Sequence, residues 1–179
     1  MQTRRELLRG LIVSVGGATA LSACGGAAQL IATTPGTSGR FYTSNEMALV
    51  SRLSDLIIPR TETPGAVDVN VPGYLDALMR DWASSDTQST HREALQMITA
   101  RLDTATGEFL TAGNSEAARA LTELDSAAFE DGSNLGGYRS LKGYITQAYF
   151  ASEDGALQEL KWVAVPGRWD PSVDVSAGG

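Results

Sequence analysis

The sequence predicts an all-α protein, in which an export signal and a flexible linker precede a compact bundle of about five helices with an irregular C-terminal tail. Apolar residues recur at helical spacing in successive segments of the chain. Residues typical of helix starts and stops bound these segments. The strand-like pattern is confined to residues 162–165, too short to support a sheet alone. We therefore expect a signal at residues 1–23, a tether at 24–40 and a helical domain at 41–179.

The leader is the first element of the chain. Arg4 and Arg5 precede an uncharged run that reaches Ala23, and a positive start followed by a short apolar run is the layout of an export signal. The paired arginines resemble a twin-arginine signal. As a helix, residues 11–23 would span about 20 Å, short of the ~30 Å apolar core of a bilayer. Cleavage is therefore favoured, although an uncleaved membrane span stays open because residues 10–39 carry no charge.

The single cysteine, Cys24, stands where the apolar run ends. It follows Leu21-Ser22-Ala23 in an order that resembles a bacterial lipobox, in which the cysteine becomes the lipid-modified first residue of the mature protein. Cleavage after Ala20 and a retained leader are the alternatives. One cysteine excludes an intramolecular disulfide and a CxxC haem or metal site. The Gly, Ala, Thr, Pro and Ser residues that follow, up to Gly39, predict a flexible tether.

The charge of the chain limits its partners. The formal net charge is −7, and because the leader carries three arginines and one glutamate, the rest of the chain carries −9. Nucleic-acid binding requires clustered Lys and Arg, and no such cluster follows the leader. The length of 179 residues suits one domain plus a leader. We expect an acidic domain that does not bind nucleic acid.

The first two predicted helices are marked by capping and proline signals. Thr43 and Glu46 form a capping-box signature, and Pro59 ends the apolar period, so residues 44–58 are predicted as a helix. Pro72 predicts the start of the second helix. Its apolar stripe, which we expect to lie in the core, consists of Tyr74, Leu75, Leu78, Met79 and Trp82.

Three further helices are predicted downstream. The third covers residues 89–109, and the fourth is short, capped by Ser115 and loosened at Asp125-Ser126. The fifth begins near Tyr138 and ends by Gly155. The glycine-rich residues 132–137 are predicted as a helix-linking loop, because no strand precedes them as a dinucleotide-binding motif requires.

The sequence holds few candidates for catalysis. The sole histidine, His91, lies in a polar run at a predicted helix start, so we expect a solvated surface histidine. Zinc or haem ligation is not expected without a second histidine or a usable thiol. The carboxylate pairs Asp76 with Asp81 and Glu153 with Asp154 could perform acid–base chemistry in a glycosidase-like cleft. Solvated or salt-bridged carboxylates are the favoured interpretation in so acidic a chain.

Two proline motifs carry a resemblance to a known family. The first is the stretch from Leu56 to Ala66 with the Val71-Pro72 helix start, and the second is Val165-Pro166-Gly167-Arg168-Trp169-Asp170. Together with the Asp81-Trp82 pair, they resemble the gluconate 2-dehydrogenase subunit 3 family over residues 43–170. Turns fixed by proline lose little entropy on binding, and exposed Arg and Trp suit a docking surface.

The resemblance implies a noncatalytic small subunit of a membrane-associated, FAD-dependent sugar or polyol dehydrogenase complex in the bacterial periplasm. The large partner, a GMC-type flavoprotein, would hold FAD and the catalytic residues. A c-type cytochrome subunit with haem c commonly accepts the electrons. The small subunit would act in a chaperone-like way in export, maturation and stability, and would hold no cofactor itself.

The candidate interface or turn-orienting residues are Pro59, Arg60, Pro64, Gly65, Pro72, Trp82, Pro166, Gly167, Arg168 and Trp169. Arg60 and Arg168 are expected to orient the two turns, either by pairing with internal carboxylates or by bonding to the partner. Two other functions stay open. One is a free-standing periplasmic lipoprotein that binds a ligand, and the other is a small carboxylate-dependent hydrolase.

Overall fold

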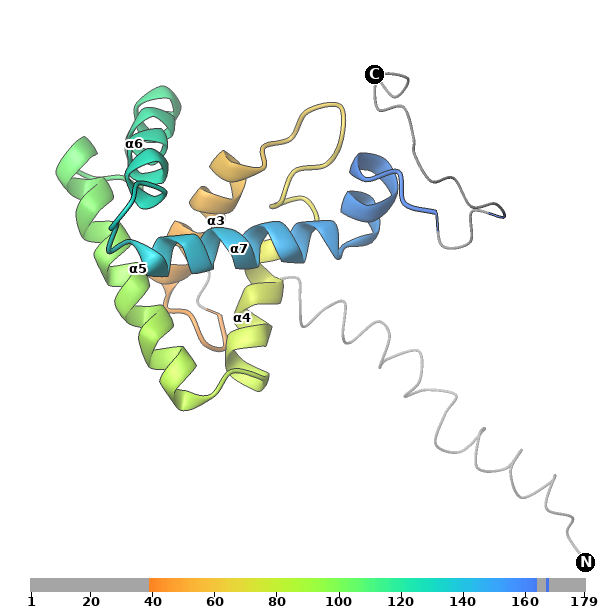
Figure 1. Cartoon of the computed structure of the whole chain (residues 1–179), viewed down its shortest axis with the longest axis horizontal. Coiled ribbons are helices and arrows are strands. Elements are labelled where there is room, and N and C mark those ends of the chain that lie inside the picture. Colours follow the sequence, from red (N-terminus) through yellow and green to blue (C-terminus); the bar gives the residue numbers. More distant parts are fainter. Residues whose placement is uncertain (1–38, 164–166, 168–179) are drawn as a thin grey trace, which may run out of the picture.

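The computed structural model describes residues 39–163 and residue 167. The predicted signal, the tether up to residue 38, and Pro166, Arg168 and Trp169 lie outside the described residues. Within them the chain forms helices and no strand, which confirms the all-α prediction. The elements are α3 (Ser44–Ile57), α4 (Val71–Asp81), α5 (Ser85–Thr106), α6 (Asn114–Ala128), α7 (Gly136–Phe150) and the short π-helix η2 (Gly155–Glu159) (Figure 1).

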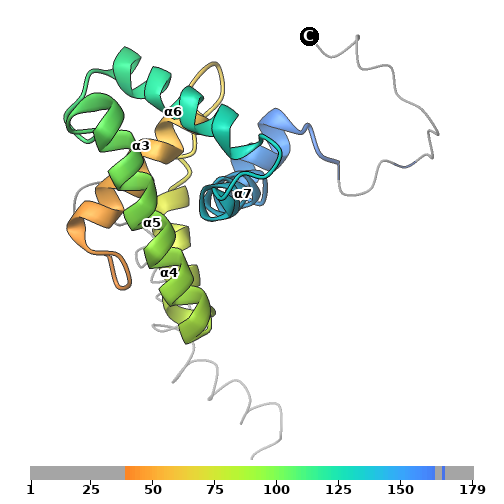
Figure 2. The ribbon, with the colours of Figure 1, turned by 60° about the vertical axis from the view of Figure 1, so that its left-hand side comes forward.

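Helix α7 is the element around which the others pack. It contacts α4, α5, α6 and η2, while α3 packs on α4 and α6 packs on α5 (Figures 1 and 2). Each helix turns an apolar face toward this centre, because burying that face is the main source of its stability. The fully buried aliphatic side chains include Leu53, Leu75, Ile98, Leu141 and Ile145.

The start of α3 confirms the capping-box prediction. The Glu46 amide donates to the Thr43 hydroxyl, and the Glu46 carboxylate accepts the Thr43 backbone N–H in return. These two bonds satisfy donors that a helix start leaves without partners. Helix α3 ends at Ile57, one residue before the predicted end.

The predicted details of α6 are wrong. Ser115 does not cap it, because the N-cap is Gly113 and Ser115 lies inside the first turn. The helix also continues through Asp125 and Ser126 to Ala128. Both side chains have partners in the fold: Asp125 accepts bonds from Tyr138 and Lys142 of α7, and the Ser126 hydroxyl donates to the Thr122 carbonyl. Contacts with another helix thus override the local preference of Asp125 for a turn, and the bond of Ser126 to the preceding turn of α6 lets it remain helical.

The stripe predicted on α4 is only partly buried. Leu75 and Met79 lie in the core, whereas Trp82 is 85% exposed and Tyr74 is also exposed. Trp82 is the C-cap, with φ −123°, so the chain leaves the helical path at this residue and its side chain leaves the stripe. Tyr74 lies beside the buried row formed by Val71, Leu75 and Met79. The core prediction for Trp82 and Tyr74 is therefore wrong.

Candidate functional site

The segment between α3 and α4 is a closed turn that carries the first proline motif. The Ala66 amide donates to the Ile58 carbonyl at 2.9 Å, which brings the two ends of the motif together. A Cβ at Gly65 would lie 2.6 Å from the Arg60 backbone nitrogen, so no larger residue fits this crossing. We call residues 58–70 the proline turn. Its backbone is fixed by its own contacts.

Arg60 pairs inside the proline turn. Its guanidinium bonds to one oxygen of Asp68, and the other oxygen of Asp68 accepts the Gly65 N–H at 2.7 Å. The hydrogen bond from the Arg60 guanidinium lowers the pKa of Asp68 below its usual value, and the hydrogen bond from the Gly65 N–H adds a smaller lowering. Of the two roles predicted for Arg60, the structure shows pairing with an internal carboxylate. An exposed ion pair adds little stability by itself, but this one aligns the two sides of the turn.

The proline turn lies against the C-terminal end of α7. The buried Tyr149 donates its hydroxyl proton to the Pro64 carbonyl at 2.8 Å. The Thr63 hydroxyl bonds to the carboxylate of Glu159 in η2. Segments that are far apart in the sequence therefore lie side by side at one end of the molecule, where Figure 1 draws the turn in gold and η2 in blue. Pro59 is exposed on this end, Pro64 is half-buried, and Pro72 is buried at the start of α4.

The chain reverses at η2 and then exposes apolar side chains. Gly155 is required at the reversal, because a Cβ there would lie 2.1 Å from the Tyr149 carbonyl oxygen. The Trp162 amide donates back to the Ala156 carbonyl at 2.9 Å. Five large hydrophobic side chains of this region are between 40% and 62% exposed, and we call them the C-terminal apolar face: Phe150, Leu157, Leu160, Trp162 and Val163.

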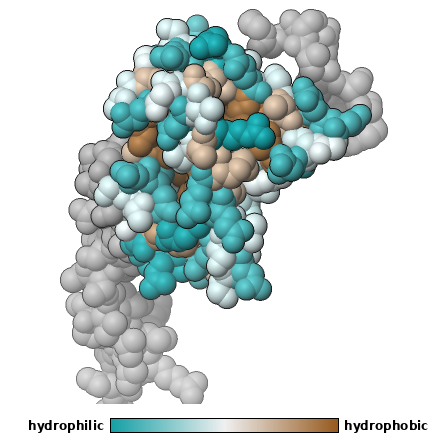
Figure 3. All heavy atoms as spheres, turned by 90° about the vertical axis from the view of Figure 1, so that its left-hand side faces the viewer, coloured by the Kyte–Doolittle hydropathy of each residue, from teal (hydrophilic) through white to brown (hydrophobic). Residues whose placement is uncertain are grey.

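Exposed large hydrophobic residues are sparse on the rest of the described surface. They are Tyr74, Trp82 and Phe129. The side of the molecule that carries α5 and α6 is covered mainly by hydrophilic residues (Figure 3). Trp82, which the sequence grouped with the proline motifs, lies at the far end of α4 and is not brought to the proline turn (Figures 1 and 2). Gly167 is exposed and has φ 72°, a conformation that favours glycine.

Asp76 is a buried structural carboxylate. It is 2% exposed and accepts the backbone N–H groups of Arg40, Phe41 and Tyr42 at 2.7–2.9 Å. Its neighbour Asp81 forms two hydrogen bonds with the Arg40 guanidinium. The expectation that Asp76 is solvated or salt-bridged is wrong, while Asp81 is salt-bridged as expected. Together the two carboxylates hold the first described residues of the chain on α4, and we call this arrangement the N-terminal clamp.

His91 is buried, so the prediction of a solvated histidine is wrong. It is 5% exposed, its Nε2 lies 2.8 Å from the Tyr42 hydroxyl oxygen, and the ring centroids of Tyr42 and Tyr144 lie 5.7 and 6.1 Å away. The reason is the start of α5 at Ser85, before the predicted start, where Ser84 caps the helix. His91 is therefore in the second turn, on the buried face that includes Leu95 and Ile98.

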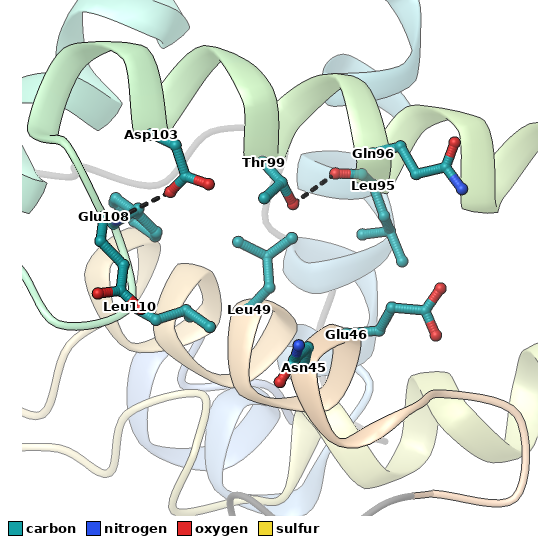
Figure 4. A pocket seen from close by; sticks show the side chains of 10 residues that line it. Asn45, Glu46, Leu49, Leu95, Gln96, Thr99, Asp103, Glu108 and Leu110 are labelled. Carbon is teal, nitrogen blue, oxygen red and sulfur yellow. Dashed lines mark hydrogen bonds between the residues drawn. The ribbon is translucent and has the colours of Figure 1, made fainter.

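A small pocket of about 220 Å³ lies between α3, α5 and the loop that follows α5 (Figure 4). Its apolar lining comes from Leu49, Leu95, Phe109 and Leu110. Its carboxylates are engaged in the fold: Glu46 pairs with Arg92 at 2.7 Å, and Asp103 accepts the Phe109 N–H at 2.8 Å. The pocket is smaller than the ~300 Å³ at which ligand sites usually begin. The pair of Glu46 and Arg92 joins the two helices, and Asp103 holds the loop that follows α5.

Sequence reasoning missed Tyr149, Asp68, Glu159 and the C-terminal apolar face. A signal for the face was present, since Leu157, Leu160 and Trp162 follow the predicted helix end at Gly155 without joining a helical stripe. The described residues contain no cluster of three or more His, Cys, Asp or Glu arranged to hold a metal ion. No described helix is long and apolar enough to cross a bilayer.

The sequence of the domain matches a known protein family. A family model described as gluconate 2-dehydrogenase subunit 3 matches residues 44–167. This range includes the proline turn, every described helix and the C-terminal apolar face. Neither the curated proteins nor the solved structures include a match.

Asp76→Ala is expected to destabilise the fold by about 2 kcal/mol or more, because it strands the buried N–H of Tyr42 and the part-buried N–H groups of Arg40 and Phe41, and a buried unsatisfied group costs ~1–3 kcal/mol. Urea unfolding of the full chain measures the change. Asp81→Ala is the matched control, and its exposed pair with Arg40 should contribute less than ~1 kcal/mol. Equal losses in the two variants would contradict the role given to Asp76.

The stability of the protein should fall as the pH drops through the range of the histidine. Burial lowers the pKa of His91 from its usual value, so the unfolded chain binds the proton more readily than the folded chain. Protonation below about pH 6.5 therefore favours the unfolded state. The stability that is present above this pH is lost as the pH falls further. The free energy of unfolding should change by at most ~1.4 kcal/mol per pH unit for this one group. In H91Q, which keeps an acceptor for Tyr42, the dependence between pH 7 and 5.5 should flatten. Glu46, whose lowered pKa also makes stability fall on acidification, acts only in the carboxylate range below that window.

Proposed function

The chain belongs to the gluconate 2-dehydrogenase subunit 3 family, and from this premise we propose that it is the noncatalytic small subunit of a periplasmic, FAD-dependent sugar or polyol dehydrogenase complex. The observation that carries the proposal is the family match over residues 44–167, which spans nearly all the described structure. The name of the family implies a complex of several subunits. The small subunit would dock on the others and stabilise them.

In this proposal the chemistry resides in the partner chains. A GMC-type large subunit holds FAD and the catalytic residues, and a c-type cytochrome subunit with haem c accepts the electrons. The chemistry of Asp76 supports this division, because its oxygens receive three backbone N–H groups and serve the fold. His91 is likewise enclosed by aromatic rings and bonded to Tyr42.

The proposed role is to escort the flavoprotein during export and to stabilise it afterwards. The leader, with Arg4 and Arg5, would direct the folded pair through the twin-arginine route. Cys24 would attach the chain to the periplasmic side of the inner membrane through a lipid. A stable domain with a fixed turn suits such a role, because preformed surfaces lose little entropy on docking.

Purification of the tagged chain from its own cells should bring down a GMC-type flavoprotein. The complex is expected to show a flavin absorption spectrum and to oxidise a sugar or polyol with an artificial electron acceptor. The chain expressed alone should be colourless and inactive. Recovery of the native chain without a flavoprotein, or flavin binding by the isolated chain, would refute the proposal.

Replacing Arg4 and Arg5 together with lysine should leave both this chain and the flavoprotein in the cytoplasm, because the twin-arginine route requires the arginine pair. Fractionation of the cells, with immunoblots for both chains, measures the outcome. Arg9→Lys is the matched control in the same leader and should leave export unchanged. Continued export of the flavoprotein in the double variant would contradict the escort role.

A further inference from the structure

The C-terminal apolar face differs from the rest of the described surface. Among the described residues, five of the eight exposed large hydrophobic side chains fall between Phe150 and Val163. Single exposed hydrophobic residues are normal on any protein, whereas a group of them marks a binding surface. Trp162 and Leu160 are each 57% exposed. Tryptophan is among the residues that most often anchor a protein interface.

The face is preformed. Its base is the end of α7, where Tyr149 is buried and bonded to the Pro64 carbonyl. Gly155 allows η2 to fold back onto that end, and the Leu160 and Trp162 amides bond to the Gly155 and Ala156 carbonyls. The backbone that carries the side chains is therefore fixed before any partner arrives, which lowers the entropic cost of binding.

Charge on the same region selects among possible occupants. Residues 153–161 include three carboxylates, Glu153, Asp154 and Glu159, against one lysine. An anionic lipid surface would be repelled by these groups. In a two-fold dimer through this face the like charges of two copies would meet, which is unfavourable. The complementary surface is an apolar patch flanked by lysine or arginine.

We propose that the C-terminal apolar face, together with the adjoining proline turn, is the surface on which the catalytic subunit of the dehydrogenase docks. This inference rests on the proposed function, because membership of a multisubunit complex supplies the partner. The catalytic subunit presents an apolar patch with basic side chains at its edge. Trp162 and Leu160 enter the patch, and Glu153 faces the basic edge.

The test uses the complex purified through a tag on this chain. In the double variant Leu160→Ser with Trp162→Ser, the flavoprotein recovered per tagged chain should fall at least about tenfold, as expected for the loss of central anchors. Trp82→Ser is the matched control, because Trp82 is even more exposed and lies at the far end of α4. Recovery should be unchanged in this control. Glu153→Lys should weaken the complex severalfold.

Several outcomes would overturn the inference. They are full recovery of the flavoprotein with the double variant, loss of the complex in Trp82→Ser, and no effect of Glu153→Lys. Self-association of the wild-type chain, or binding to anionic vesicles, that the double variant abolishes would assign the face to another occupant. A lowered urea midpoint of the isolated double variant would assign it to a contact within the chain. If the wild-type chain recovers no flavoprotein at all, the proposed function itself fails.

Discussion

The packing of α7 is the constraint on which the other elements depend. Near its start, a Cβ at Gly137 would lie 2.5 Å from the Ala94 side chain, so a glycine is needed for the close approach of α5. Near its end, the Tyr149 hydroxyl holds the proline turn through the Pro64 carbonyl. The same helix contacts α4, α6 and η2. A shift of α7 would therefore move the core and the C-terminal apolar face together.

The helices were predictable where the signal is local. Thr43 and Glu46 of the capping box lie within one turn of each other, and Pro72 marks the helix start at which it stands. Both signals are present in the structure. One error arises where a distant contact decides, and another where a local cap is missed. Asp125 stays helical because Tyr138 and Lys142 of another helix bond to it. His91 is buried because α5 starts at Ser85, and Ser84 was not recognised as its cap.

The candidate site was predictable only in part. Proline and glycine fix backbone angles locally, so the sequence could identify Pro59, Pro64 and Gly65 as a turn and offer an internal partner for Arg60. The sequence could not place this turn beside η2, because the bond between Tyr149 and Pro64 joins residues 85 positions apart. Apolar spacing also predicts burial poorly at the ends of helices, where the chain leaves the helical path. Trp82 fits the α4 stripe but lies beyond its last helical residue.

Helix α4 links the N-terminal clamp to the docking end. It begins at Val71, directly after the proline turn, and Asp76 receives the backbone of residues 40–42 less than two turns later. At ~1.5 Å per residue, the five steps from Val71 to Asp76 correspond to about 7.5 Å along a single rigid helix. The point where the chain enters the domain is therefore held at a fixed distance from the turn.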